Sequence, residues 1–273
     1  MTRNARKTAR TQAQRADKYV CYQESVQEPE ADIPVIERIF RKSRGRPPRT
    51  LREDFCGTAA FACAWVEHHR ENRAYGIDLD PEPLAWGLRH NVAPLSPEQQ
   101  SRVKLIQGNV LDVGHEPVDV TVAFNFSYFL FRTRPEMLRY FEQARATLNS
   151  DGLLFLDLYG GPEAQQAQTE RRKCEGFTYV WEQASFDPIQ NWGVNYIHFE
   201  FPDGSVSRRA FSYEWRIWSI PELREILDEA GFSRTEVYWE GTDRATGDGN
   251  NVFTRRESAK DDPAWVAYLV AVP

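Results

Sequence analysis

The stretch Thr50-Leu-Arg-Glu-Asp-Phe-Cys-Gly-Thr-Ala59 decides the fold. It has the pattern of a short strand that ends in acidic residues, followed by a tight Cys-Gly-Thr turn and by an apolar helix from Ala60. Such a turn lets a ligand approach the backbone at a helix N-terminus. The later stretch Arg73-Ala-Tyr-Gly-Ile-Asp-Leu-Asp80 predicts the next parallel strand, which ends on Asp78. A nucleoside-binding α/β sheet holds a carboxylate there for ribose hydroxyls, so the two stretches predict the two halves of a nucleoside site.

This pair of motifs resembles the class I S-adenosylmethionine-dependent methyltransferases, in their small-molecule, glycine N-methyltransferase-like branch. The first motif of that family is an acidic residue, an apolar residue and a glycine-rich turn often written Gly-Cys-Gly-Thr-Gly. Cys56-Gly57-Thr58 matches the turn, and Glu53 stands in the acidic place. Phe55 and Ala59 replace the outer glycines, so only Gly57 keeps full backbone freedom. The phenylalanine at position 55 has two possible consequences. Either the turn has a different shape from that of the family, or the Phe55 ring covers part of the cofactor pocket.

The resemblance implies S-adenosylmethionine as the cofactor, S-adenosylhomocysteine as the product, and no metal. Asn109 and Val110 follow the predicted third strand at the place where the family holds the adenine, although Asn109 as an ordinary turn residue is an equal alternative. The residues implied to bind the cofactor are Tyr22, Glu53, Cys56, Gly57, Thr58, Ala59, Asp78, Leu79, Asn109, Val110 and Asn125.

Strands and helices alternate regularly from Leu51 onward, which favours a parallel sheet with helices on both faces. The resemblance implies a Rossmann-like, doubly wound α/β fold with a seven-stranded sheet. Residues 149–152 are expected to form a turn, and a polar Gly- and Asp-rich loop is expected before the last strand. The other predicted strands are residues 103–107, 118–124, 153–158, 235–239 and 265–272, and the later helices are residues 136–148 and about 220–230.

Residues 177–215 differ in character, because aromatic and polar residues alternate there around a Pro202-Asp-Gly204 turn. This pattern predicts an inserted antiparallel β structure, and the resemblance implies that it roofs the acceptor pocket. The expected organisation is therefore a basic N-terminal arm with lid helices (1–49), a cofactor-binding core (50–161), the β insertion (162–215), and a closing helix with the last strands (216–273).

The acceptor end of the site is expected at the end of the fourth strand, where Asn125 and Tyr128 are the candidate catalytic residues. A partial likeness to the Asn-Pro-Pro-Tyr motif of amino-directed nucleic-acid methyltransferases is discounted, because both prolines are missing. Tyr19 and Tyr22 are lid candidates, or they pack the N-terminal helix on the core. An aromatic cage for the acceptor is one reading of the later aromatic residues, and core packing is the other. The candidate substrate-binding residues are Tyr19, Tyr128, Tyr213, Trp215 and Trp218.

The amino-acid composition disfavours some classes of binding partner. The chain of 273 residues carries 34 basic and 40 acidic side chains, a net charge of -6, so nucleic acid and acidic membranes are disfavoured. The basic residues before Lys18 are expected to form a solvated, partly disordered arm, with a nucleic-acid arm as the sharper alternative. No apolar run of membrane-spanning length or secretory type is present, which favours a cytoplasmic protein. The 4 cysteines lack Cys-x-x-Cys spacing and are expected to be reduced thiols.

The sequence therefore predicts direct in-line transfer of a methyl group from S-adenosylmethionine to a nitrogen, oxygen or sulfur of a small molecule. One alternative is a nucleic-acid or protein methyltransferase that uses the basic arm. Another is a non-catalytic S-adenosylmethionine-binding protein, which the departures at Phe55 and Ala59 would explain. A dehydrogenase is the weakest alternative, because Gly-x-Gly-x-x-Gly is absent after the first strand. A monomer and a dimer are both open.

Overall fold

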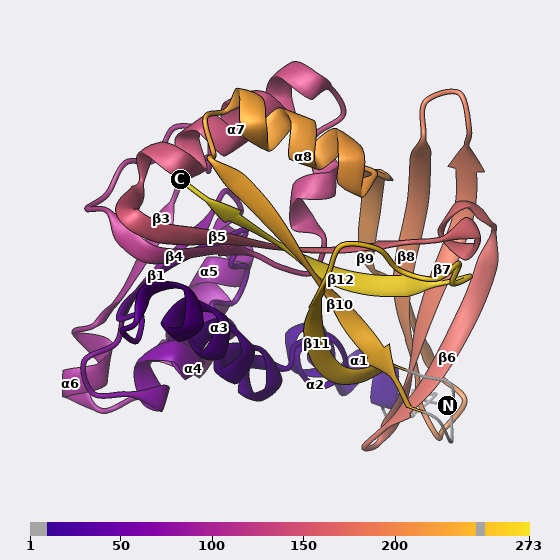
Figure 1. The fold of residues 1–273 in the computed structure, drawn as a ribbon. Coiled ribbons are helices and arrows are strands. Elements are labelled where there is room, and N and C mark those ends of the chain that lie inside the picture. Colours follow the sequence, from indigo (N-terminus) through magenta and orange to yellow (C-terminus); the bar gives the residue numbers. More distant parts are fainter. Residues whose placement is uncertain (1–9, 244–248) are drawn as a thin grey trace, which may run out of the picture.

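Two β-sheets lie side by side, and helices cover the larger one (Figure 1). The computed structural model describes residues 10–243 and 249–273. Within these ranges the larger sheet has eight strands in the order β11-β10-β12-β5-β4-β1-β2-β3. Its strands are β1 (Thr50–Asp54), β2 (Arg73–Asp78), β3 (Val103–Gln107), β4 (Val118–Ala123), β5 (Leu148–Gly160), β10 (Arg234–Thr242), β11 (Gly249–Arg256) and β12 (Trp265–Val272).

The five neighbouring strands from β3, at one edge of this sheet, to β5 are parallel, and the strands towards the other edge are antiparallel. β1 pairs in parallel with β2 and β4, β2 with β3, and β4 with β5. β12 runs antiparallel to both β5 and β10. The chain adds strands in one direction from β1 to β3 and then crosses back to β4, so β1 and β4 meet at the switch in strand order. Ligands of open α/β sheets bind beside the carboxyl ends of the strands at this point.

Helices cover both faces of the larger sheet, as the alternating sequence pattern predicts. α3 (Pro29–Arg44) and α4 (Ala60–His68) contact each other on one face, and α7 (Arg134–Ala146) and α8 (Ile220–Glu229) do so on the other (Figure 1). The crossover from β3 to β4 is a loop over residues 108–117. The shorter helices are α1 (Gln12–Arg15), α2 (Lys18–Val26), α5 (Pro81–Gly87), α6 (Pro97–Gln100) and the turns η1 (Leu88–Val92), η2 (Ser127–Leu130) and η3 (Pro162–Gln165).

The predicted antiparallel insertion is present as the smaller sheet. Its strands β6 (Gln168–Cys174), β7 (Phe177–Asp187), β8 (Trp192–Glu200) and β9 (Val206–Arg216) pair in that order, each antiparallel to the next. Figure 1 shows this sheet standing beside the end of the larger one, next to β12 and the N-terminal helices.

The structure departs from the predicted elements in two places. The larger sheet has one strand more than the seven expected, because β11 forms a hairpin with β10 where a polar loop was predicted. Residues 149–152 belong to β5 and do not form a separate turn; the register of β5 against β4 shifts between Val118 and Val120 to accommodate them. Residues 1–9 of the predicted basic arm lie outside the described residues; after them, the amides of Gln12 and Ala13 donate to Asp203 and Ser205, which follow β8.

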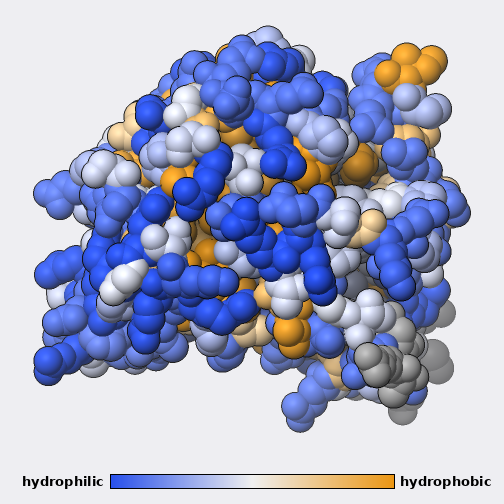
Figure 2. Space-filling view, in the orientation of Figure 1, coloured by the Kyte–Doolittle hydropathy of each residue, from blue (hydrophilic) through white to orange (hydrophobic). Residues whose placement is uncertain are grey.

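The surface carries no extended apolar area on the face that Figure 2 shows, where hydrophobic side chains form small scattered groups. Ile189 is the most exposed large hydrophobic residue of the described chain, at 94%, and it lies in the turn between β7 and β8. Within the described residues, no helix combines the length and the apolar character needed to cross a membrane. These residues also contain no cluster of three or more His, Cys, Asp or Glu side chains arranged for a metal ion, and all 4 cysteines are free thiols.

A buried ion pair lies in the centre of the larger sheet. The guanidinium of Arg52 donates to the carboxylate of Asp54 at 2.6 Å, and neither side chain reaches the surface. Arg52 also donates to the Val110 carbonyl at 2.9 Å, and the Tyr140 hydroxyl donates to Asp54 at 3.0 Å. The pair therefore ties β1 to α7 and to the loop that follows β3.

Replacing one member of this pair will destabilise the protein more than replacing both. Arg52→Met leaves the Asp54 carboxylate buried without a cation, which costs about 3–5 kcal/mol in the free energy of unfolding. The double variant Arg52→Met with Asp54→Leu will recover part of that loss, because no lone buried charge remains. Urea denaturation of the three proteins measures this; a double variant as unstable as the sum of the two single variants would contradict it.

Candidate active site

The turn after β1 takes a left-handed backbone at every second residue. The φ angles are 58° at Phe55, 52° at Gly57 and 56° at Ala59. For residues other than glycine this conformation costs about 1–2 kcal/mol each. Phe55 and Ala59 thus adopt the conformation that glycine favours, and the turn keeps its shape without the two outer glycines. Backbone strain of this kind gathers at functional sites.

The Phe55 ring points away from the turn. Its centroid lies 6.1 Å from that of Phe131 and 5.7 Å from that of Tyr140, in the core beneath α7. The side chain also forms part of the wall of the cavity described below. Phe55 therefore combines a left-handed backbone with a ring that both packs on the core and borders the cavity.

Asp78 joins the turn to the end of β2. The Gly57 amide donates to one carboxylate oxygen of Asp78 at 2.7 Å, and the Asp80 amide donates to the other at 2.9 Å. Burial raises the pKa of this carboxyl group, and the two amides oppose that rise. Leu79 beside it is 67% exposed. A carboxylate with free lone pairs therefore stands at the open edge between the β1 turn and β2.

Glu53 faces the opposite side of β1 from Arg52 and Asp54, because side chains alternate along a strand. One of its oxygens accepts a hydrogen bond from the Ala62 amide at 2.9 Å, near the start of α4. The other oxygen has no hydrogen-bond partner among the described residues. Burial raises the pKa of Glu53 to about 8, and the carboxylates of Asp78 and Asp54 add to the rise. An extra cation near Glu53 would relieve this cost.

The neighbours of the turn fix Thr58 and Cys56. The Gln23 side chain of α2 donates to the Thr58 hydroxyl at 2.6 Å, and the Asn91 side chain donates to the Thr58 carbonyl at 2.8 Å. Cys56 is buried, and its amide donates to the Ile77 carbonyl at 3.0 Å. Gly87 of α5 lies so close that a Cβ atom there would stand 2.2 Å from the Thr58 carbonyl oxygen. The turn is thus held from β2, α2 and α5 together.

The loop after β3 holds the residues expected at the adenine. The side-chain oxygen of Asn109 accepts from the Leu111 amide at 3.0 Å, which is the local turn contact that the sequence left as an alternative. The Val110 side chain is buried, and its carbonyl accepts from Arg52. The side-chain amide nitrogen of Asn109 has no partner among the described residues and stays available to a ligand.

The chain turns sharply at the end of β4. Asn125 and Phe126 both have left-handed φ angles, 58° and 57°, and their amides donate to the Asp157 carboxylate at 2.6 and 2.9 Å. Tyr128 lies on the other side of this turn in the core, and its hydroxyl donates to the Asp157 carbonyl at 2.8 Å. Asn125 therefore faces the space beyond the strands, whereas Tyr128 holds β5 in place and does not contact that space.

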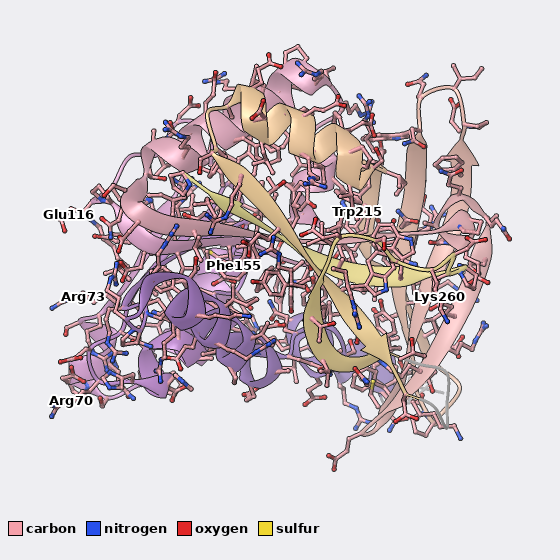
Figure 3. All side chains as sticks on the ribbon, in the orientation of Figure 1. Arg70, Arg73, Glu116, Phe155, Trp215 and Lys260 are labelled. Atoms are coloured by element: carbon pink, nitrogen blue, oxygen red, sulfur yellow. The ribbon has the colours of Figure 1, made fainter. Side chains whose placement is uncertain are left out.

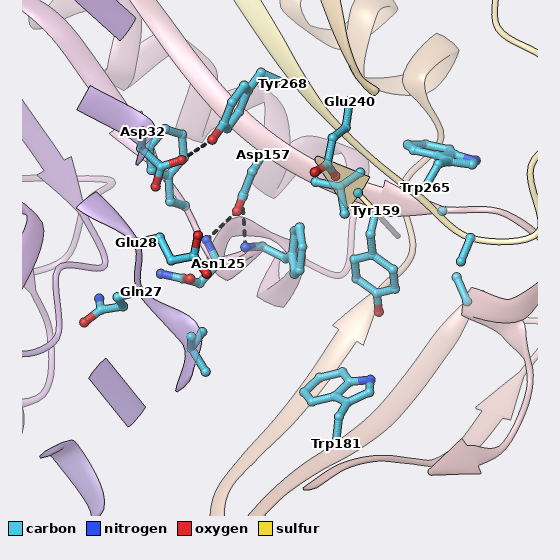
Figure 4. Close-up of a pocket in the computed structure, with 18 of the residues that line it drawn as sticks. Gln27, Glu28, Asp32, Asn125, Asp157, Tyr159, Trp181, Glu240, Trp265 and Tyr268 are labelled. Carbon is cyan, nitrogen blue, oxygen red and sulfur yellow. Dashed lines mark hydrogen bonds between the residues drawn. The ribbon is translucent and has the colours of Figure 1, made fainter. Parts of the chain in front are cut away.

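A cavity of about 630 Å³ opens at the carboxyl ends of β1, β4 and β5, under the insertion (Figure 4). The insertion contributes Tyr213 and Trp215 to its wall, and Figure 3 shows Trp215 between the two sheets. The predicted site residues that line it are Tyr22, Glu53, Asn125, Tyr213 and Trp215.

Three of the expected substrate residues do not reach this cavity. Tyr19 is buried against Trp86, and its hydroxyl donates to Glu82 at 2.9 Å. Trp218 is buried, and its indole donates to the Phe131 carbonyl at 3.1 Å. Tyr128 is in the core, as described. These three side chains pack in the protein interior. Core packing was one of the two interpretations that the sequence allowed for its aromatic residues.

Several residues that the sequence did not single out line the cavity. Asp157 and Tyr159 lie on β5, where an acidic residue inside an apolar strand was the available signal. Asp32 of α3 accepts a hydrogen bond from the Tyr268 hydroxyl (Figure 4). Glu240 of β10 is drawn near Tyr159 in the same view. These side chains come from elements far apart in the chain, so no local pattern marks them as one group.

Comparisons with known proteins give the fold a name. No protein-family model matches the sequence, and no curated protein matches it. Solved structures do match the fold over nearly the whole chain. An amino pentose methyltransferase from Micromonospora echinaspora, solved with S-adenosylmethionine bound, is 16% identical with a TM-score of 0.62, over 93% of this chain and 96% of that one.

Two further structures agree. The sugar N-methyltransferase from a Streptoalloteichus species is 18% identical with a TM-score of 0.62, over 94% of this chain and 92% of that one. The methyltransferase CcbJ from Streptomyces caelestis is 17% identical with a TM-score of 0.63, over 92% of each chain. The parallel sheet with helices on both faces and the antiparallel β insertion match the expectation from the sequence. The chain therefore has the class I S-adenosylmethionine-dependent methyltransferase fold.

Proposed function

We propose that the protein is an S-adenosylmethionine-dependent methyltransferase that transfers a methyl group to a nitrogen, oxygen or sulfur of a small molecule. The observation that carries the proposal is the 2.7 Å hydrogen bond from the Gly57 amide to the Asp78 carboxylate, which joins the turn after β1 to the end of β2. Neither residue lines the cavity, whose wall takes Glu53 and Phe55 from the segment just before Gly57. The same fold in methyltransferases supports it, and the names of two of those proteins include an amino pentose and a sugar as substrates.

The residues of the site fit this cofactor chemically. When bound, S-adenosylmethionine supplies an activated methyl group on a sulfonium cation. Glu53 offers a buried carboxylate oxygen without a partner, suited to a positively charged group. Asp78, beside Leu79, would accept hydrogen bonds from ribose hydroxyls, and the loop of Asn109 and Val110 would border the adenine. The turn Cys56, Gly57, Thr58 and Ala59 would present backbone to the methionine part, and Tyr22 would cover it.

The residues around the acceptor would promote the reaction by holding the acceptor in line with the methyl group and by excluding water. Holding two reactants in line can supply roughly 7–11 kcal/mol of the barrier, so no covalent help from the protein is needed. The Asn125 side-chain amide has no hydrogen-bond partner among the described residues and would orient the acceptor. Tyr128 would act as a positioning residue through β5. Tyr213 and Trp215 would exclude water from the reacting groups.

This assignment divides the chain as the sequence suggested. We propose that residues 50–161 and 216–273 hold the cofactor, that residues 162–215 roof the acceptor, and that residues 1–49 close the site from the N-terminal side. The contact of Gln23 with Thr58, at 2.6 Å, supports a closing role for α2. The hydrogen bonds of α1 to the insertion support the same role, and not that of a free arm for nucleic acid.

Removal of the Asp78 carboxylate will weaken cofactor binding. Asp78→Ala loses charge-assisted hydrogen bonds to the ribose, so the Kd for S-adenosylmethionine will rise at least about tenfold. Calorimetric titration measures the change. Asp228→Ala on the exposed side of α8 is the matched control and will bind as the unaltered protein does. An unchanged Kd for Asp78→Ala would place the ribose elsewhere.

A methyl group added at Gly87 will disturb the cofactor turn. In Gly87→Ala the new Cβ would stand 2.2 Å from the Thr58 carbonyl oxygen, so the turn must shift. Alanine favours a helix more than glycine does, so helix propensity cannot explain a loss. We expect at least about tenfold weaker S-adenosylmethionine binding. Gly114→Ala, which meets nothing within 4 Å, is the control. Equal affinities for the two variants would show that the turn does not contact the cofactor.

Cofactor affinity will depend on pH through Glu53. Its pKa of about 8 means that the free protein carries a proton there below that pH. A bound cation lowers this pKa, so the proton must leave, and affinity rises as the pH approaches 8 and is level above it. Glu53→Gln removes this contribution, while the titration of the cofactor's own amino group remains. Titrations between pH 6 and pH 9 will therefore show a steeper rise for the unaltered protein; parallel curves would contradict the assignment.

A further inference from the structure

We propose that the methyl acceptor is a small molecule with a protonated amine, and that the enzyme methylates this nitrogen. The inference rests on the proposed function and narrows its open choice among nitrogen, oxygen and sulfur. It comes from the charge and the aromatic surface of the cavity, beyond the residues assigned to the cofactor.

Three carboxylates from different elements converge on the acceptor part of the cavity (Figure 4). Asp157 lies on β5, Asp32 on α3 and Glu240 on β10. They accept hydrogen bonds only from neutral groups within the described residues: the amides of Asn125 and Phe126, the Tyr268 hydroxyl, and the Asn251 amide. None of the three pairs with a lysine or arginine side chain of the described chain, so no cation of the described residues stabilises their charged forms.

The two arginines in the cavity wall are already engaged. Arg171 pairs with Glu200 at 3.5 Å, and Arg172 donates to the Ser25 carbonyl and covers the Tyr179 ring. Burial raises the pKa of Asp157 to about 8, and the charge of Asp32 adds to that rise. Burial likewise raises the pKa of Asp32 to about 6. A cationic ligand would offset these costs, and an anionic ligand would increase them.

Aromatic side chains complete a surface suited to a cation. Tyr159 follows Asp157 by two residues, so both point to the same side of β5. The Trp215 ring lies 6.3 Å from Tyr159 and 5.7 Å from Trp181, and all three line the cavity. Rings of this kind attract ammonium groups through their faces.

Two polar groups in this wall have no partner. Trp215 is only 4% exposed, yet its indole N–H makes no hydrogen bond to a described residue. The Tyr159 hydroxyl is likewise without a partner among the described residues, and it lies in the open cavity (Figure 4). Both side chains lie in the cavity wall, so their polar atoms are open to a ligand that carries polar atoms of its own besides the ammonium group.

The reaction balances with the groups present. The ammonium group of the acceptor gives a proton to the Asp157 carboxylate, which keeps free lone pairs beside its two amide contacts. The neutral nitrogen attacks the methyl carbon, a nitrogen–carbon bond forms, and the carbon–sulfur bond breaks with its electron pair left on sulfur. The cofactor cation becomes a neutral thioether, the product becomes a methylammonium ion, and Asp157 returns its proton to the solvent.

Three probes of similar size and different charge test the inference: benzylamine, benzyl alcohol and benzoate. The protein is first saturated with S-adenosylhomocysteine, which occupies the cofactor site and leaves the acceptor site open. Each probe is then titrated at pH 7.5 by calorimetry. We expect benzylamine to bind at least tenfold more tightly than benzyl alcohol, and benzoate not to bind. Equal binding of amine and alcohol, tighter binding of benzoate, or no binding of any probe would overturn the proposal.

Substitutions of Asp32 and Glu240 test whether these carboxylates bind the amine. Asp32→Asn and Glu240→Gln will each weaken benzylamine binding at least threefold and leave S-adenosylmethionine binding unchanged. Glu225→Gln, on the exposed side of α8, is the control and will alter neither. Unchanged benzylamine affinity in both variants would overturn the assigned site. If S-adenosylmethionine itself does not bind, the proposed function fails; if it binds but the probes show no charge preference, only this inference fails.

Discussion

The alternation of side chains along β1 is the constraint on which the rest of the structure depends. Four polar or acidic residues lie in or next to a central strand, where a parallel sheet normally carries apolar residues. Because successive side chains point to opposite faces, Arg52 and Asp54 pair with each other in the core, and Glu53 lies on the other face beside the start of α4. The pair anchors the loop after β3 through the Val110 carbonyl, and the turn that follows anchors β2 through Asp78. One strand thus positions three parts of the site.

The strand order determines where the cavity lies, and the carboxyl groups in its wall determine which ligands it favours. In the proposed methyl transfer the donor is a sulfonium cation, and the cavity wall carries buried carboxyl groups whose pKa values are raised to about 8 at Glu53 and Asp157. These groups are costly in the empty protein, because burial disfavours their charged forms. The cost is offset when cations enter.

The sequence predicted those parts that short segments determine. The β1 turn, β2 with its terminal Asp78, α8 and the last strand all follow from residues within ten positions of each other. It did not predict β11 or the start of β5, because a polar hairpin and residues 149–152 resemble loops when their pairing partners are unknown. The acceptor wall was missed for a similar reason. Asp32, Asp157 and Glu240 meet only through the tertiary fold, and the side that Tyr128 faces depends on the left-handed residues Asn125 and Phe126 just before it.

The measurement that tests the central claim most directly is calorimetric titration of the unaltered protein with S-adenosylmethionine and S-adenosylhomocysteine, with NAD as the control nucleotide. The account predicts micromolar, one-to-one binding of the first two and no binding of NAD, because the turn and Asp78 form a nucleoside site without the glycine pattern of a dehydrogenase. Failure of both methyl-transfer nucleotides to bind, or preferential binding of NAD, would contradict it.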